Sequence, residues 1–257
     1  MKDIQCPQCG ALVPEGTKQC PVCGYRFITV SDDSWKSAFV RIFSRKRVLT
    51  MVLVFVAELA IMFALTAMPM SGSTANQIVN QNEPSLQSVR ALPLIVRSFS
   101  IFSHNYEIAS IEIIPVIGQI FFLISTYSTA IVLNALAISQ GVTGPLALVS
   151  LLLLPYSWLE LPSYAIATTE GAFLIYSLFT KHFRKEIKTA VIVWLMVGLE
   201  LLTAGIFESW TIALESSNNL SLLFITWIPY AVIIAIFVVV VRHFVHRFQT
   251  DMAMGRN

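Results

Sequence analysis

Charged residues are scarce in this sequence, and their scarcity excludes most classes of soluble protein. Asp, Glu, Lys and Arg together make up 12% of the 257 residues, against about 25% in globular proteins. Hydrophobic residues reach 56%, and the mean hydropathy is +0.71. The sequence therefore predicts an all-α polytopic membrane protein. The net charge of +2 is small and the basic residues cluster at a few junctions, which argues against a nucleic-acid-binding surface.

Catalytic and nucleotide-binding motifs are also missing. The sequence has no His-Glu-x-x-His, no Gly-x-Ser-x-Gly and no Gly-rich Walker A motif. We therefore expect that the protein is not an enzyme, and that an ATPase, if one is needed, is a separate subunit. The first residues lack the basic and apolar regions of a signal peptide, which predicts an N-terminal domain that stays in the compartment where it is made.

Cysteine is absent after position 23, and the cysteines that are present form two copies of one short motif. CPQCG spans 6–10 and CPVCG spans 20–24, with ten residues between the two pairs. Each pair turns two thiolates toward one point, and Gly10 and Gly24 can adopt the positive φ that lets backbone N–H groups face sulfur. The pattern predicts a tetrahedral structural zinc site in a ribbon at 1–28, with Cys6, Cys9, Cys20 and Cys23 as ligands. Disulfides, redox thiols and rubredoxin-like iron are the alternatives.

Residues 31–47 have the pattern of an amphipathic helix. Ser31 is a candidate N-cap, and apolar residues from Trp35 to Phe43 recur at helical spacing among basic ones. We expect 29–47 to contain a cytoplasmic helix that lies on the membrane surface and leads into the first span. A soluble linker helix is the alternative.

Six apolar segments follow, each interpreted as a membrane span. They run from 48 to 68, about 113 to 138, 146 to 161, 162 to 179, 189 to 207 and 220 to 241. The segment 146–179 is either two tightly joined spans or one span beside a re-entrant hairpin. Between the first two spans, 69–110 is predicted to be a polar outer loop with a short helix at 86–102. The membrane domain then covers 48–248, and 249–257 is a cytoplasmic tail.

Basic clusters at 36–47, 181–188 and 242–247 predict the orientation of this domain. With six spans all three clusters fall on one side, and the positive-inside rule makes that side cytoplasmic. Both termini are then cytoplasmic in a multi-pass protein of the cell membrane. Cysteines that are free to bind metal agree with a reducing environment on the N-terminal side.

Four glutamates lie within or at the ends of the predicted spans, where an ionised carboxylate costs at least about 2.5–3.5 kcal/mol. They are Glu58, Glu160, Glu170 and Glu200, and no Lys or Arg lies inside the predicted spans to pair with them. We expect a polar seam that includes Asn134, serving either as hydrogen-bonded contacts between helices or as a proton or ion path. Pro155 and Pro162 remove helical N–H groups beside Glu160, which indicates a broken helix like those that form transporter sites or helical hairpins.

The stretch LPYSWLELP at 154–162, with Asn134 upstream, resembles the SpoIIM family of stage II sporulation protein M-like integral membrane proteins. Family members commonly read Pro-His-Gly-x-x-Glu-(Leu/Ile)-Pro here, and this chain keeps Glu160 and Pro162 but has Tyr-Ser in place of His-Gly. The resemblance covers about 45–245 and implies a six-span bundle with a polar Glu-Pro motif. In spore-forming bacteria it implies a scaffold that holds peptidoglycan-remodelling enzymes at the septum. The N-terminal zinc ribbon is similar to the architecture of archaeal relatives.

Two functions are expected from this combination. The first is a non-enzymatic membrane scaffold or complex subunit, which binds a cytoplasmic protein through the zinc ribbon and a second partner, such as an envelope protein, through the outer loop. The second is a permease-like subunit of an ABC-2 type transporter, because six spans with both termini inside and a preceding surface helix look like those permeases. Such a subunit needs a separate ATPase. Besides the lipid bilayer, a second copy of the chain is a further candidate partner.

Overall fold

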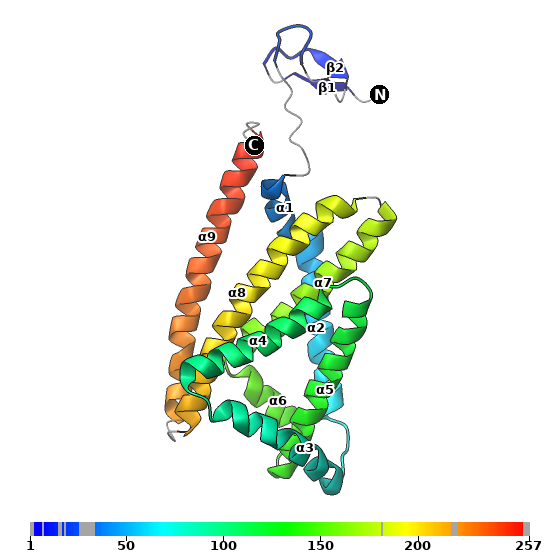
Figure 1. The fold of residues 1–257 in the computed structure, drawn as a ribbon. Helices are drawn as coiled ribbons and strands as arrows, with labels where there is room; N and C mark the ends of the chain where they lie inside the picture. Colours follow the sequence, from blue (N-terminus) through cyan, green and yellow to red (C-terminus); the bar gives the residue numbers. More distant parts are fainter. Residues whose placement is uncertain are drawn as a thin grey trace.

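A computed structural model describes a small ribbon and a helical bundle (Figure 1), over residues 3–6, 8–14, 17, 19–25, 34–180, 182–216 and 220–253. In the ribbon, β1 (Asp3–Gln5) pairs antiparallel with β2 (Leu12–Pro14). Val13 packs against Cys6 and Cys20 in a core of very few residues. Because so small a core contributes little burial, the cysteines must supply most of the stability of the ribbon.

The described helices succeed one another along the chain and form one bundle. They are α1 (Trp35–Ile42), α2 (Arg45–Thr66), α3 (Gly72–Arg90), α4 (Leu94–Glu112), α5 (Ile117–Ser139), α6 (Gly144–Leu152), α7 (Ser157–Thr180), α8 (Phe183–Ser216), a 3-10 helix at Leu220–Thr226 and α9 (Trp227–Ala253). α2, α7, α8 and α9 run along the length of the bundle, whereas α3 lies at one end and α4 runs obliquely (Figure 1). α8 packs most extensively against α4 and α7.

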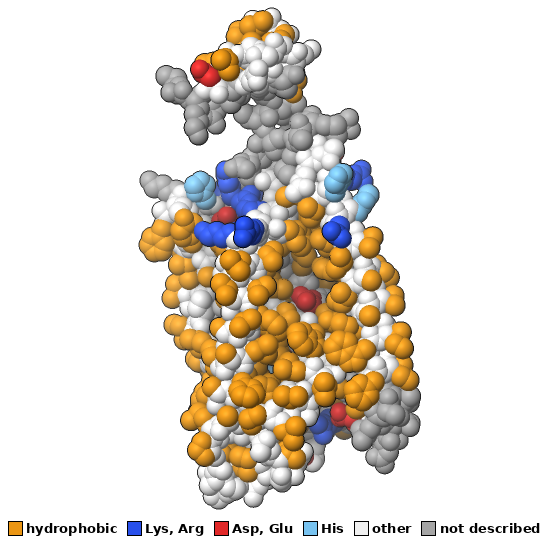
Figure 2. All heavy atoms as spheres, turned by 180° about the vertical axis from the view of Figure 1, so that it is seen from behind, with side chains coloured by type: hydrophobic (Ala, Val, Ile, Leu, Met, Phe, Trp, Pro, Cys, Tyr) orange, Lys and Arg blue, Asp and Glu red, His pale blue; other side chains and the backbone are white. Residues whose placement is uncertain are grey.

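Several of the described helices have the length and composition of membrane spans. α2, α5, α8 and a segment at Leu223–Asp251, which includes most of α9, each pass this test. α6 and α7 pass it together, although they meet at a 97° bend, so the number of spans is four, or five if the bent pair forms one. Figure 2 shows a broad hydrophobic surface below a rim rich in Lys and Arg. These features indicate a multi-pass membrane protein, but the predicted number of six spans is not confirmed.

The boundary predicted between the spans at 146–161 and 162–179 is wrong. α6 ends at Leu152 and α7 begins at Ser157, so the chain turns between these residues and not at 161–162. Pro155 stands in this turn, whereas Pro162 lies in α7, where it removes one hydrogen bond near the start of the helix. α7 therefore continues for 24 residues, and α6, with nine, is too short to cross about 30 Å. The alternative of one span beside a re-entrant hairpin agrees better with this arrangement.

The prediction that 69–110 is a loop with one short helix is also wrong, because this segment forms α3 and most of α4. α3 is polar and mostly exposed, whereas α4 packs against α5, α7 and α8. The buried residues of α4 recur every three or four positions and include Arg97, Ile101, Asn105, Ala109 and Glu112. Polar residues on this buried face lower the hydropathy of the segment. Arg97 donates to the carbonyl of Ser209 in α8, and Glu112 accepts a hydrogen bond from Ser125 of α5.

The helix predicted at 31–47 is divided between α1 and the start of α2. Ser34 caps α1 by accepting a hydrogen bond from the backbone N–H of Ser37 at 3.1 Å, while Ser31, the expected N-cap, lies outside the described residues. α1 packs against α8 and α9, and the ring of Phe39 meets that of Phe248 edge-on at 5.6 Å. The first and last helices of the bundle therefore meet at one end (Figure 1).

Candidate metal centre and intramembrane polar cavity

The four cysteines of the ribbon converge on one point. Their Sγ atoms all lie within 4.8 Å of one another, and the Cys6–Cys23 and Cys9–Cys20 pairs are each separated by 3.6 Å. Four thiolates around zinc, with Zn–S bonds of ~2.3 Å, have S–S edges of about 3.8 Å, whereas a disulfide bond measures about 2.05 Å. The ribbon therefore contains a four-sulfur site that can bind a metal ion, in agreement with the prediction.

The backbone of the two knuckles explains why the thiols meet. In each knuckle a glycine N–H donates to the carbonyl of the first cysteine, from Gly10 to Cys6 at 2.8 Å and from Gly24 to Cys20 at 3.0 Å. Both glycines have a φ of +74°, as predicted, and this conformation is strained for other residues. The backbone N–H of Cys23 is the largest of several contributions that lower the pKa of the Cys20 thiol from 9.0 to about 7. The backbone N–H of Ala11 acts in the same direction on Cys9, but neighbouring thiols and burial outweigh it and raise the pKa of Cys9 to about 12. A lower pKa favours the thiolate, which is the form that binds metal.

Two of the four predicted glutamates meet in a cavity of about 230 Å³ between α2, α4, α5 and α7. The polar residues that line it are Glu58, His104, Asn105, Ser125, Thr126, Thr129, Glu160 and Tyr164. Glu160 accepts a hydrogen bond from the hydroxyl of Tyr164 at 3.1 Å. Glu58 is only 2% exposed, and its Oε2 atom has no hydrogen-bond partner among the described residues.

A third carboxylate beside this cavity was missed by the sequence reasoning. Glu112 is fully buried at the end of α4, and its Oε1 atom accepts a hydrogen bond from Ser125 at 2.9 Å. Its carboxylate is close enough to that of Glu58 for the two negative charges to repel each other. The loop prediction concealed Glu112 together with His104 and Asn105. The spacing of three or four residues along α4 is the signal that could have revealed this buried face.

Glu170 lies outside this cavity and is paired with an arginine. Arg47 of α2 binds Glu170 of α7 and Glu186 of α8, and its guanidinium lies 4.2 Å from the centre of the Phe173 ring. The side chains of Arg47 and Glu170 are 3% and 1% exposed. The expectation that these acids have no basic partner is therefore wrong for Glu170. The surface helix was predicted to contain Arg47, but α2 begins at Arg45 and carries it into the bundle.

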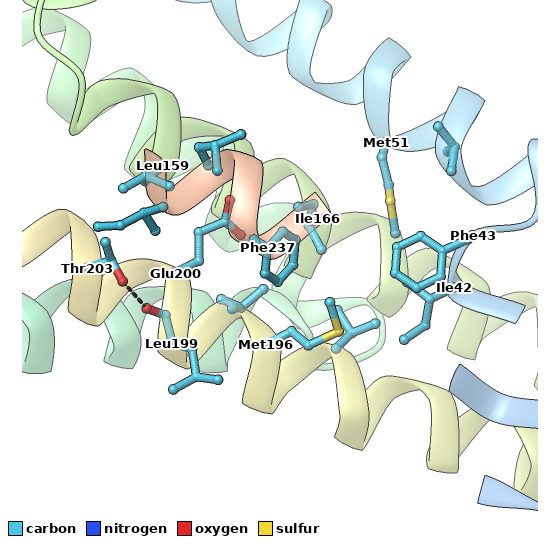
Figure 3. Close-up of a pocket in the computed structure, with 15 residues that line it drawn as sticks. Ile42, Phe43, Met51, Leu159, Ile166, Met196, Leu199, Glu200, Thr203 and Phe237 are labelled. Atoms are coloured by element: carbon cyan, nitrogen blue, oxygen red, sulfur yellow. Dashed lines mark hydrogen bonds between the residues drawn. The ribbon is translucent and has the colours of Figure 1, made fainter. Parts of the chain in front are cut away.

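Glu200 lies in a second pocket, which has a volume of about 300 Å³ and a mostly apolar lining (Figure 3). Met51 of α2 and Phe237 of α9 contribute to this lining. Thr203 is a polar neighbour, and its hydroxyl donates to the carbonyl of Leu199 at 2.8 Å, within its own helix. The four predicted glutamates are thus divided among three places instead of forming one seam.

Asn134 and Pro162, the other two residues predicted for the polar site, do not line the polar cavity. Asn134 donates its side-chain N–H to the carbonyl of Met68 at 3.0 Å, just beyond the end of α2. Next to it, a Cβ atom on Gly144 would lie 2.2 Å from the carbonyl oxygen of Thr66, so only glycine allows α6 to approach this closely. Pro162 lies in the α7 helix and does not line the polar cavity.

Residues 5–29 match the uncharacterised protein family UPF0547. The match includes both cysteine knuckles and ends before the helical bundle, so it does not assign the bundle to a family. No curated protein and no solved structure matches the chain. None of these findings supports the resemblance to the SpoIIM family.

Proposed function

We propose that the protein is a non-enzymatic subunit of a membrane complex, which binds a cytoplasmic protein through its ribbon. The observation that carries this proposal is the surface of the ribbon. Leu12 on β2 and Val22 in the second knuckle are 72% and 71% exposed. Large apolar side chains outside so small a core are suited to protein docking, because their burial against a partner removes apolar surface from water.

Zinc is the metal that we assign to the ribbon. A tetrahedral site with four cysteine ligands is the usual structural zinc site, and it leaves no coordination position for a substrate. In such a site the free energy of metal binding contributes to folding, so the metal shapes the docking surface. Metal analysis of the purified protein should find one zinc ion per chain. One iron ion per chain would contradict this assignment.

Both termini are cytoplasmic in this proposal, and the charges at one end of the bundle support that orientation. The N-terminal end of α2, the junction of α7 and α8 and the C-terminal end of α9 lie together there (Figure 1). They carry basic residues at 45–47, 184–188 and 242–247. Ion pairs from Lys36 and Arg41 connect α1 to Asp251 of α9 and to Glu186 of α8. The positive-inside rule places such an end in the cytoplasm.

Quantitative co-purification of the tagged full-length protein from its native membranes tests the proposal. We expect a partner in near-stoichiometric amount, and a loss of about tenfold or more in its recovery with the Leu12→Ser/Val22→Ser variant. This variant keeps all four cysteines. Leu86→Ser, which changes an exposed apolar residue on α3, is the matched control. Equal recovery of the partner with the ribbon variant would refute the proposal.

A more specific form of this proposal is that the helical bundle is a SpoIIM-like membrane domain. Its support is the position of Glu160 and Pro162 directly after the bend between α6 and α7. It predicts envelope proteins, including cell-wall-remodelling enzymes, among the purified partners.

A permease-like subunit of an ABC-2 type transporter is the second candidate. Transporter sites are often built at broken helices. The observation that favours this candidate is the polar cavity, where Glu160 of α7 lies just after the bend between α6 and α7. It predicts a stoichiometric ATPase in the same purification. Recovery of envelope proteins without an ATPase would exclude this candidate.

A further inference from the structure

The cavity that contains Glu58 and Glu160 has one buried carboxylate oxygen without a hydrogen-bond donor among the described residues. The Oε2 atom of Glu58 is buried and has no hydrogen-bond partner in the described part of the chain. Glu160 has the hydroxyl of Tyr164 as a donor, at 3.1 Å. An unpaired acceptor in a buried site is destabilising, and more so when it is charged. An occupant of the cavity that interacts with Glu58 would remove this cost.

The positive charges of the described bundle do not provide this interaction. None of the residues that line the cavity is Lys or Arg. The two buried arginines are bound elsewhere, since Arg47 contacts Glu170 while Arg97 donates to the carbonyl of Ser209 at 2.7 Å. His104, the basic residue in the lining, is exposed. A proton can neutralise one buried carboxylate, whereas a bound cation balances Glu58 and Glu160 together and also fills the cavity.

The lining favours a cation that prefers oxygen ligands. α5 contributes the hydroxyls of Ser125, Thr126 and Thr129, while α2 and α7 each contribute one carboxylate. In the described residues, the four cysteines form the one group of three or more His, Cys, Asp or Glu side chains close enough to share a bare ion. The cavity offers two carboxylates and several hydroxyls, so water molecules would complete the coordination of an ion there. Mg²⁺ is typically held by one or two carboxylates and keeps several water molecules.

The size of the cavity agrees with a hydrated ion. One water molecule needs only about 10–15 Å³ of cavity volume, so a cavity of about 230 Å³ has room for an ion with several water molecules. We propose that this cavity binds one hydrated divalent cation of the Mg²⁺ class through Glu58 of α2 and Glu160 of α7. The charge of the ion balances the two carboxylates, and its water shell reaches the hydroxyls of α5. The inference is independent of the ribbon and its partner.

Binding of MgCl₂ to the full-length, zinc-loaded protein in detergent micelles tests the site by calorimetry and thermal melting. We expect one Mg²⁺ ion per chain and a rise in the melting temperature of the bundle that NaCl at equal ionic strength does not reproduce. Glu58→Gln and Glu160→Gln keep the size of the side chain but remove its charge. Each should weaken Mg²⁺ binding by about tenfold or more. Glu200→Gln, which removes a carboxylate from the other pocket, should bind Mg²⁺ like the wild type.

Three outcomes would overturn the inference. The first is an absence of saturable Mg²⁺ binding to the wild type, and the second is unchanged binding in both cavity variants. The third is an equal loss of binding in Glu200→Gln, which would show that the effect is not local. If Glu58→Gln does not fold, the wild type and Glu160→Gln decide the question by direct binding.

Discussion

Arg47→Met should strongly destabilise the bundle, because it leaves Glu170 buried without its basic partner. Glu170 is 1% exposed, and both of its hydrogen bonds from a cation come from Arg47. Glu186, which also binds Arg47, is 17% exposed and keeps Arg41 at 3.4 Å. The cost of the substitution therefore falls mainly on Glu170.

The expected magnitude follows from the burial of the pair. Removing one partner of a buried ion pair costs about 3–5 kcal/mol, whereas replacing both with apolar residues of similar volume is often neutral. We therefore expect a loss of ~3–5 kcal/mol in the free energy of unfolding for Arg47→Met. The Arg47→Met/Glu170→Met double variant should recover most of this loss.

Unfolding by SDS titration in mixed micelles provides the assay for this double-mutant cycle. The matched control is Arg45→Met, because Arg45 lies two residues away on the exposed side of α2. It should change the unfolding free energy by less than about 0.5 kcal/mol. The reasoning is refuted if Arg47→Met behaves like this control, or if the double variant is as unstable as the sum of the two single variants.

Three further predictions concern the ribbon, the cavity and the packing of α6. Chelation or Cys20→Ser should unfold the ribbon but leave the helical far-UV circular dichroism and the melting of the bundle intact; loss of that melting transition would contradict this independence. Glu160→Leu removes the acceptor for Tyr164 and should cost ~1–3 kcal/mol in stability, whereas Glu160→Gln should cost less. A Leu variant that melts no lower than the wild type would count against this. Gly144→Ala forces α6 away from α2 and should cost ~1–3 kcal/mol, while Gly72→Ala, at a site with open space, should have little effect; equal melting of the two variants would argue against tight packing at α6.

The ribbon could be predicted from the sequence because its signals are local. The spacing of the cysteines and the glycine after each pair determine both knuckles within a few residues, and the predicted positive φ is found at Gly10 and Gly24. The apolar segments that became α2, α5, α8 and α9 were also recognisable, since each is long and continuous. The bend near Pro155 was misplaced by several residues, because a proline near the start of a helix and one in a turn have similar sequence signals.

The candidate site was less predictable because it depends on contacts between distant segments. α4 contributes His104 and Asn105 to the cavity, but its polar residues gave the segment the composition of a loop. Arg47 and Glu170 are 123 residues apart in the chain, and their pairing depends on where α2 begins and on how it meets α7. The four glutamates were expected to form one polar seam, but only Glu58 and Glu160 line the same cavity, while Glu170 and Glu200 lie elsewhere.

A photo-crosslinking amino acid at Val22, introduced into the full-length protein in its native membrane, tests the central claim most directly. The account predicts one discrete adduct with a partner protein. This adduct should disappear when Cys20→Ser removes the metal site, and the same probe at Gln81, an exposed position on α3, should not form it. Absence of an adduct at Val22, or the same adduct from the unfolded ribbon, would contradict a docking role for the ribbon.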